Sequence, residues 1–259
     1  MPPEAMAGRV LLVGAGPGPA DLLTLRAVRA IEAADALLYD ALVSDEVLAL
    51  APRTCTRIQT GKRAGRASMA QSTINSLMVR LARQGLSVVR LKGGDPAIFG
   101  RVGEELDHLR GQGVRVEMIP GVTAACAAAA QFAFPLTHRG VARQLLFSTG
   151  RTEDGSAVRV PAPADGAVTF ALYMARDRVA EECARLMAAG WFPTTPAAAI
   201  ENAGAEDARL LRGDLISLPD RLAAAAPSGP ILIIVGEVVA RARAANGLAM
   251  TPQTLLKAV

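Results

Sequence analysis

One segment constrains the fold of this 259-residue chain more than any other: residues 90–101, which read RLKGGDPAIFGR. Residues 87–91 are rich in β-branched and aliphatic side chains and predict a short strand. Gly93 and Gly94 then let the backbone approach a ligand without a Cβ atom in the way, and Asp95 can accept hydrogen bonds from a hydroxyl or an amine. Since open α/β sheets bind ligands at the carboxyl ends of their strands, we predict a ligand-binding loop here.

The pattern along the chain predicts an α/β protein with two domains. Strand and helix patterns alternate in the first half, which implies parallel strands covered by helices on both faces. We expect strands at residues 9–13, 36–39, 56–60, 87–91 and 114–118, and then at 144–149, 168–174, 197–201, 208–212 and 230–235. The expected helices include 70–84, 123–130, 177–189 and 215–226. The expected organisation is a tail (1–8), a first domain (9–135), a linker (136–143), a second domain (144–245) and a C-terminal tail (246–259), with a mostly parallel or mixed five-stranded sheet in each domain.

Composition argues against several classes of function. Hydrophobic residues make up 51% of the chain, yet its apolar runs are far too short to span a membrane. Aromatic residues make up only 3% and do not alternate with basic ones, so we expect no nucleic-acid partner. The first six residues lack the basic and apolar regions of a signal peptide, so we expect a simple tail there.

The cysteines and histidines predict neither disulfides nor a metal site. Cys55, Cys126 and Cys183 lack CxxC spacing, which suggests reduced thiols and a cytoplasmic location, and two histidines are too few for a histidine metal site. The net charge is +4, and arginine, which outnumbers lysine, binds carboxylates in a fork-like geometry. A ligand with several carboxylates therefore fits better than nucleic acid, although a solvated surface explains most of these arginines.

A second glycine-rich loop, GAGPGP at residues 14–19, has the spacing of a dinucleotide-binding motif. Asp40 even stands where a ribose-binding carboxylate would be expected. Pro17 and Pro19, however, lack the backbone N–H groups that a pyrophosphate needs. An NAD-binding oxidoreductase is therefore a remote alternative, and a binding or regulatory protein without turnover is another.

Five sequence blocks together resemble the tetrapyrrole methylase family. They are GAGPGP at residues 14–19, GGDP at 93–96, RVGEE at 101–105, PGVTAA at 120–125 and PLTHRG at 135–140. In this order they are similar to the uroporphyrinogen-III C-methyltransferases of that family, over residues 9–239. The resemblance implies an active site in the cleft between the two domains, a homodimer, and S-adenosyl-L-methionine as methyl donor, which leaves as S-adenosyl-L-homocysteine. The implied reaction methylates two pyrrole carbons of uroporphyrinogen III and gives precorrin-2.

The resemblance also assigns roles to individual residues. Asp40 matches the proposed proton acceptor of the family and Lys62 its proposed proton donor. Arg101 and Glu104 lie one helical turn apart and are expected to meet the substrate. The positions that match contacts with the methyl donor are Pro17, Gly93, Gly94, Asp95, Ile98, Thr123, Ala124, Met174 and Ala203. Without the resemblance, Asp40 would be interpreted as a helix N-cap and Lys62 as a loop charge. Ile98, Met174 and Ala203 would be interpreted as core residues.

Several positions depart from the family pattern. Pro19 and Ala20 replace an Asp-Pro pair, and Val102 replaces a glycine. Arg151 stands where histidine is frequent, and Ala203 replaces another glycine. These departures concern the substrate more than the methyl donor. A C-methyltransferase of a later precorrin is thus the nearest alternative, and a relative that methylates protein or RNA is more distant; the pathway could be that of siroheme, cobalamin or haem d1.

Overall fold

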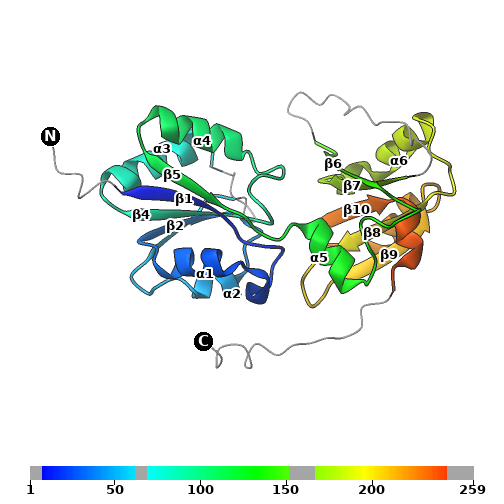
Figure 1. Ribbon diagram of the computed structural model, residues 1–259, viewed down its shortest axis with the longest axis horizontal. Coiled ribbons are helices and arrows are strands. Elements are labelled where there is room, and N and C mark those ends of the chain that lie inside the picture. The colour runs from blue at the N-terminus through cyan, green and yellow to red at the C-terminus, as the bar shows by residue number, and fades with distance from the viewer. Residues whose placement is uncertain (1–7, 62–68, 152–166, 244–259) are drawn as a thin grey trace. The chain divides into compact units, whose positions relative to one another are not determined.

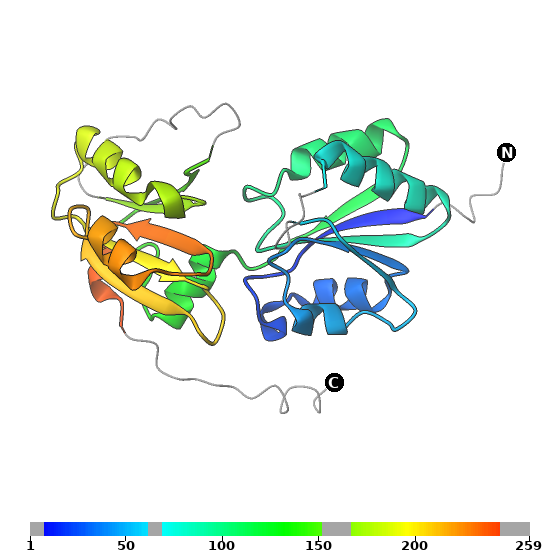
Figure 2. The same ribbon diagram turned by 180° about the vertical axis from the view of Figure 1, so that it is seen from behind.

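The chain forms two compact α/β units, a first unit within residues 1–123 and a second within 124–259. The structure is a computed structural model that describes residues 8–61, 69–151 and 167–243. Each unit contains a five-stranded sheet, which confirms the expected fold class (Figures 1 and 2). The first unit ends earlier than the predicted boundary. Leu136, Val141 and Ala142, from the predicted linker, instead pack into an apolar cluster of the second unit, because burial takes these side chains out of water.

The sheet of the first unit is entirely parallel, with strand order β3-β2-β4-β1-β5. Its strands are β1 (Arg9–Gly14), β2 (Ala36–Tyr39), β3 (Thr56–Gln59), β4 (Ser87–Lys92) and β5 (Arg115–Ile119). Its helices are α1 (Leu25–Glu32), α2 (Asp45–Ala49), α3 (Gln71–Arg83) and α4 (Val102–Gly111), with a 3-10 turn η2 (Ala20–Leu22) before α1. The parallel arrangement expected from the strand–helix alternation is confirmed.

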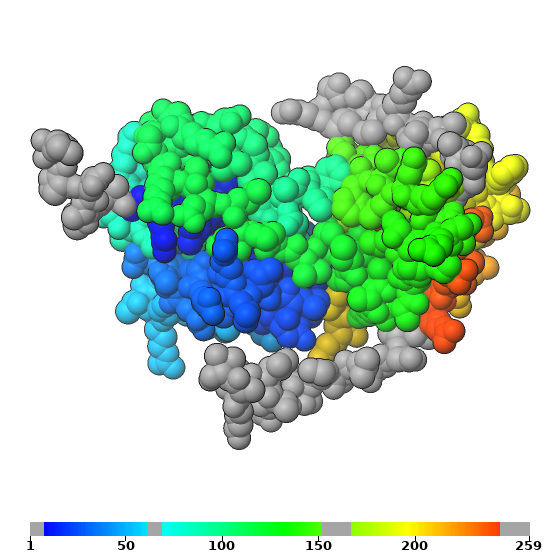
Figure 3. All heavy atoms as spheres, viewed as in Figure 1, coloured from blue at the N-terminus to red at the C-terminus, as the bar shows by residue number. Residues whose placement is uncertain are grey.

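Alternate residues of these strands pack on opposite helical layers. Leu11 and Leu37 join an apolar cluster with α1 and α2, whereas Leu12 and Leu38 join another with α3 and α4. Figure 1 shows the two helix pairs on opposite faces of the sheet, and in Figure 3 blue residues cover one side of this unit and green residues the other. The sheet is buried on both sides, as its near-continuous apolar strands require.

The strand order creates a divergence of the chain around β4. Its neighbours β1 and β2 lead to α1 and α2 on one face of the sheet, whereas β4 leads to α4 on the other face. Adjacent parallel strands whose connections leave in opposite directions open a crevice at their carboxyl ends. The GGDP loop follows β4 and the GAGPGP loop follows β1, so the topology places both loops at this crevice.

The sheet of the second unit is mixed, with strand order β6-β7-β10-β8-β9. Its strands are β6 (Gln144–Thr149), β7 (Val168–Tyr173), β8 (Pro196–Glu201), β9 (Arg209–Asp214) and β10 (Ile231–Val235). Helices α6 (Val179–Ala188) and α7 (Leu218–Ala225) pack on one face; α5 (Ala124–Gln131) and the 3-10 helix η4 (Glu237–Arg241) pack on the other, and a further turn, η3 (Arg176–Arg178), precedes α6. In the part of the chain that the structure describes, no helix is both long and apolar enough to cross a membrane.

Candidate active site

The two glycine loops of the first unit are bonded to each other. Gly94 donates its N–H to the carbonyl of Gly16 at 2.7 Å, and Gly16 donates to Gly94 at 3.2 Å. Ala15 donates to the carbonyl of Lys92 at 2.8 Å, and Ala20 to the carboxylate of Glu46 at 3.1 Å. Most N–H groups of the loop after β1 are thus already used, and its prolines have none. The loop offers no phosphate cradle, which argues against the dinucleotide alternative.

A third loop, after β5, closes on the other two through glycines. A β-carbon on Gly121 would lie 2.3 Å from the carbonyl oxygen of Gly94, and one on Gly14 would lie 2.6 Å from the Cα of Gly121. Neither distance is compatible with a side chain, so backbone meets backbone here. Thr123 ends this loop and is buried; a β-carbon on Gly94 would lie 3.7 Å from its Cα. The loops after β1, β4 and β5 therefore form one contiguous surface.

Asp95 ties two of these loops together. Its Oδ2 accepts a hydrogen bond from the N–H of Gly121 at 2.9 Å, and its Oδ1 accepts one from the N–H of Ala97 at 2.8 Å. The sequence suggested only that Asp95 would contact a ligand. An ionised carboxylate has about four acceptor positions, so two remain for a ligand hydroxyl or amine.

Four of the six non-glycine residues with a left-handed φ in the described part of the chain lie at, or next to, positions that the resemblance assigned to ligands. Left-handed φ angles occur at Phe99 (51°) and Arg101 (54°) in the loop after β4, and at Met174 (56°) and Asn202 (51°) after β7 and β8. A non-glycine residue in this region costs on the order of 1–3 kcal/mol and persists where the surroundings enforce it, most often at functional sites. The other two residues with this conformation, Ala133 and Ala226, lie away from the assigned positions.

Arg101 and Glu104, the residues expected to meet the substrate, bind each other. The guanidinium donates from Nε and from its terminal nitrogen to the two carboxylate oxygens, each at 2.7 Å, and both side chains are about half exposed. The hydrogen bonds from Arg101 lower the pKa of Glu104. An exposed ion pair of this kind contributes little to the stability of the fold.

Asp40 follows β2 at the same edge of the sheet and is not a helix cap. Helix α2 is capped by Ser44, whose hydroxyl accepts from the N–H of Val47 at 3.3 Å. The carboxylate of Asp40 instead accepts from Arg90 at 2.6 Å and from the hydroxyl of Thr60 at 3.3 Å, both through Oδ1. Its side chain is 33% exposed. The N-cap interpretation is therefore wrong.

Lys62, the expected proton donor, lies outside the described residues, so its role stays a prediction. The residue before it, Gly61, packs tightly on the chain next to Asp40: a β-carbon there would lie 2.4 Å from the amide nitrogen of Ala41. Pro17 and Ile98, two of the positions matched to the methyl donor, are half-buried in the loops after β1 and β4.

The assigned residues of the second unit also share one edge of their sheet. β7 and β8 both run antiparallel to β10, so their carboxyl ends coincide, and Met174 and Ala203 follow these ends. Met174 is 47% exposed, whereas Ala203 is buried in an apolar cluster. Ala124 begins α5, which is held at this edge by a 3.3 Å hydrogen bond from Ala125 N–H to the hydroxyl of Tyr173.

Glu201, at the end of β8, organises the adjoining loop. The N–H groups of Gly229 and Ser228 donate to its Oε1 at 2.7 and 2.8 Å, and Arg209 donates to Oε2 at 2.6 Å. The hydrogen bond from the Gly229 N–H contributes most to a lowered pKa of Glu201, whereas burial of the side chain opposes this shift.

The structure adds a buried group of charges that the sequence analysis did not single out. Arg90 and Lys92 on β4 and Glu105 on α4 are 3%, 4% and 0% exposed. Burial, followed by the nearby charge of Arg90, lowers the pKa of Lys92. The sequence signal was two cations at alternate positions of a central strand, since such positions face a layer that is otherwise apolar.

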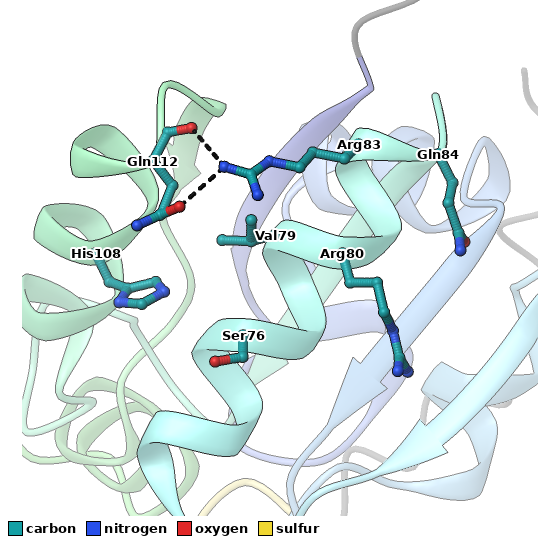
Figure 4. Close-up of a pocket in the computed structure, with 7 residues that line it drawn as sticks. All are labelled: Ser76, Val79, Arg80, Arg83, Gln84, His108 and Gln112. Atoms are coloured by element: carbon teal, nitrogen blue, oxygen red, sulfur yellow. Dashed lines mark hydrogen bonds between the residues drawn. The ribbon is translucent and has the colours of Figure 1, made fainter.

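A groove of about 490 Å³ lies elsewhere, between α3 and α4 (Figure 4). Its lining residues are Ser76, Val79, Arg80, Arg83, Gln84, His108 and Gln112. Arg83 spans it and donates to the side-chain oxygen of Gln112 at 2.9 Å. None of the assigned residues lines this groove. Its residues lie toward the C-terminal ends of α3 and α4, which precede β4 and β5. The groove is therefore near the amino ends of these strands, whereas the glycine loops follow the carboxyl ends.

Several known proteins are similar to this chain in sequence. The siroheme synthase of Nitrosospira multiformis is 46% identical over 237 residues, and siroheme synthase 1 of Yersinia enterocolitica is 49% identical over 233 residues. The alignments cover 91% and 90% of this chain but only 50% and 49% of those proteins, so the chain spans about half their length.

Solved structures match most of this chain. A uroporphyrin-III C-methyltransferase from Thermus thermophilus, in complex with S-adenosyl homocysteine, has a TM-score of 0.78 and 39% identity, and the match covers 90% of this chain and 100% of that one. A cobalt precorrin-4 methyltransferase has a TM-score of 0.79 at 26% identity, with coverage of 92% and 98%. The sequence profile of the Tetrapyrrole (Corrin/Porphyrin) Methylases matches residues 9–219. The chain belongs to the tetrapyrrole methylase family.

Proposed function

We propose that this chain transfers methyl groups from S-adenosylmethionine to two pyrrole carbons of uroporphyrinogen III and so forms precorrin-2. The observation that carries the proposal is the single edge of the first sheet at which three glycine loops, Asp40 and the Arg101–Glu104 pair come together. The 39% identity to a uroporphyrin-III C-methyltransferase over the whole of that structure supports the same substrate. We further propose that the protein is a homodimer in the cytoplasm.

The loops suit a methyl donor that carries no phosphate. S-adenosylmethionine supplies an electrophilic methyl group on sulfur when it is bound. Gly93 and Gly94 present backbone without side chains, and their hypothetical β-carbons approach neighbouring atoms no closer than 3.4 and 3.7 Å. A ligand can therefore lie against this backbone, with the remaining acceptor positions of Asp95 available to its ribose hydroxyls or amine.

Asp40 is the residue that we assign to proton removal. The pyrrole carbon that gains a methyl group becomes part of a cationic, iminium-like ring, which regains neutrality by losing a proton. Oδ1 of Asp40 is engaged by Arg90 and Thr60, whereas Oδ2 has no hydrogen-bond partner among the residues that the structure describes. Oδ2 is thus the oxygen that can accept the proton, and Arg101 would hold a carboxylate of the substrate nearby.

Two measurements on one pair of proteins test this proposal. Calorimetry on the wild-type chain should show binding of S-adenosylmethionine and none of NAD. Asp40→Asn keeps the size of the side chain but cannot accept the proton, so kcat should fall about 10²–10⁴-fold while both substrates still bind. Tight binding of NAD without a response to the methyl donor would refute the methyltransferase assignment. Wild-type turnover in the variant would remove Asp40 from the chemistry.

A further inference from the structure

Two cations on β4 point into the layer between the sheet and helices α3 and α4. Arg90 and Lys92 lie on the same face of the strand as Val88, which packs in the apolar cluster of that layer. Side-chain exposures of 3% and 5% leave both charges without water. A charge in such a place must be paired and hydrogen-bonded, because its desolvation is otherwise very costly.

Glu105 holds both cations from α4. Its carboxylate oxygens each accept from Nζ of Lys92 at 3.0 Å, and Oε1 also accepts from Nε of Arg90 at 3.3 Å. Gln71 on α3 donates to the same Oε1 at 3.0 Å and to Asn75 at 3.0 Å. Glu105 is therefore fixed from the strand and from α3, and it fixes one side of the Arg90 guanidinium.

The other sides of that guanidinium face the candidate active site. One terminal nitrogen of Arg90 donates to the hydroxyl of Thr60 and to the carbonyl of Leu91, each at 3.1 Å. The second donates to Oδ1 of Asp40 at 2.6 Å. A planar guanidinium with partners on three sides has one orientation, so the position of its last partner is set by the buried ones.

The cluster is balanced in charge and open at one member only. Two cations, Arg90 and Lys92, meet two carboxylates, Glu105 and Asp40, and only Asp40 reaches solvent, with 33% of its side chain exposed. Stability alone is a weak reason for such a cluster, since apolar residues of similar volume often serve as well or better. Apolar residues could not donate hydrogen bonds to Oδ1 of Asp40 while its Oδ2 keeps no partner among the described residues.

We propose that Arg90 is a positioning residue for Asp40: it holds the carboxylate that removes the proton, and Glu105 holds Arg90 in turn. This inference rests on the proposed role of Asp40. It predicts that substitution of Arg90 slows the chemical step through Asp40 and leaves the affinity for both substrates largely unchanged.

A double-mutant cycle on kcat tests this directly. Arg90→Lys keeps the positive charge but loses the planar guanidinium that donates to several partners at once, so kcat should fall by about 10–10²-fold. KM for uroporphyrinogen III and the calorimetric Kd for S-adenosylmethionine should change by less than about threefold. In the double variant with Asp40→Asn, Arg90→Lys should not lower kcat any further, because the carboxylate through which Arg90 acts is already gone. Arg185→Lys, at an arginine paired with the buried Glu182 on α6, is the matched control and should keep wild-type kcat.

The possible outcomes distinguish the positioning role of Arg90 from the proposed function of the chain. If Asp40→Asn is slow and Arg90→Lys turns over like the wild type, the positioning role is refuted and the proposed function stands. If the two losses multiply in the double variant, Arg90 acts on the fold and not through Asp40, which also refutes it. Wild-type turnover of Asp40→Asn removes Asp40 from the chemistry and overturns the positioning role of Arg90 with it, whereas the methyltransferase function stands. If Arg90→Lys does not fold, Thr60→Val is the second variant, because it removes the hydroxyl that Arg90 and Asp40 share. Thr60→Val should lower kcat in the wild-type background and not in the Asp40→Asn background; any other result refutes the inference.

Discussion

Replacing Gly121 by alanine should separate the three loops of the candidate site. The new β-carbon would lie 2.3 Å from the carbonyl oxygen of Gly94 and 2.9 Å from the Cα of Gly14. Carbon and oxygen approach to about 3.3 Å at the closest, so the loop after β4 must move by about 1 Å. Overpacking of this kind costs about 1–3 kcal/mol, and the upper end applies because both obstacles are backbone atoms.

The functional loss should exceed the loss of stability. A displacement of about 1 Å in a positioning element can lower a rate on the order of 10²-fold, and the GGDP loop carries several positions assigned to the methyl donor. Urea unfolding, calorimetry with S-adenosylmethionine and kcat on one preparation measure all three effects. Gly111→Ala is the matched control: its β-carbon meets nothing within 4 Å, and alanine favours the helix by up to about 1 kcal/mol. A Gly121→Ala protein with wild-type stability and affinity would show that the loops do not meet as described.

Three further predictions concern charge and accessibility. Arg101→Leu should raise KM for uroporphyrinogen III and weaken the salt dependence of its binding. The control variant Arg115→Leu, at the opposite edge of the same sheet, should change neither quantity. If Arg101→Leu loses binding of the methyl donor, the role of Arg101 is structural. The lowered pKa of Glu201 stabilises the fold above the ordinary pKa of a glutamate, and this contribution is lost as pH falls through the folded value. Urea unfolding of Glu201→Gln should therefore show a deficit of about 1–3 kcal/mol at pH 7 that shrinks in acid, and a deficit independent of pH would contradict this. Iodoacetamide at pH 8 should label the exposed Cys126 first and spare Cys183, whose pKa burial raises to about 11; peptide masses that show equal labelling would disprove the burial.

The strands and their flanking loops could be predicted because their signals are local. The expected strand at residues 36–39 is β2, and that at 144–149 is β6, with the same ends. Direction in the second sheet could not be predicted, since a buried strand has the same apolar pattern whether its neighbour is parallel or antiparallel. The sequence was therefore compatible with a mixed sheet, but the order of its strands could not be predicted.

The inner part of the candidate site depends on contacts between distant segments. The hydrogen bond from Arg90 to Asp40 joins residues fifty positions apart, and Glu105 comes from a third element. The left-handed backbone at Phe99 and Arg101 carries no glycine signal, because the surrounding loop imposes it. Residue types indicated which groups could do the chemistry, whereas tertiary packing decides how they are held.

The central claim is the transfer of two methyl groups to uroporphyrinogen III, and product analysis tests it most directly. The wild-type chain is incubated without oxygen with uroporphyrinogen III and S-adenosylmethionine labelled in its methyl group, and the tetrapyrrole is followed by absorbance and mass. We expect two labelled methyl groups on carbon, as in precorrin-2, with two S-adenosylhomocysteine molecules formed for each tetrapyrrole. A chain that binds the methyl donor but leaves uroporphyrinogen III unlabelled, and instead methylates a later precorrin, would contradict the proposed substrate.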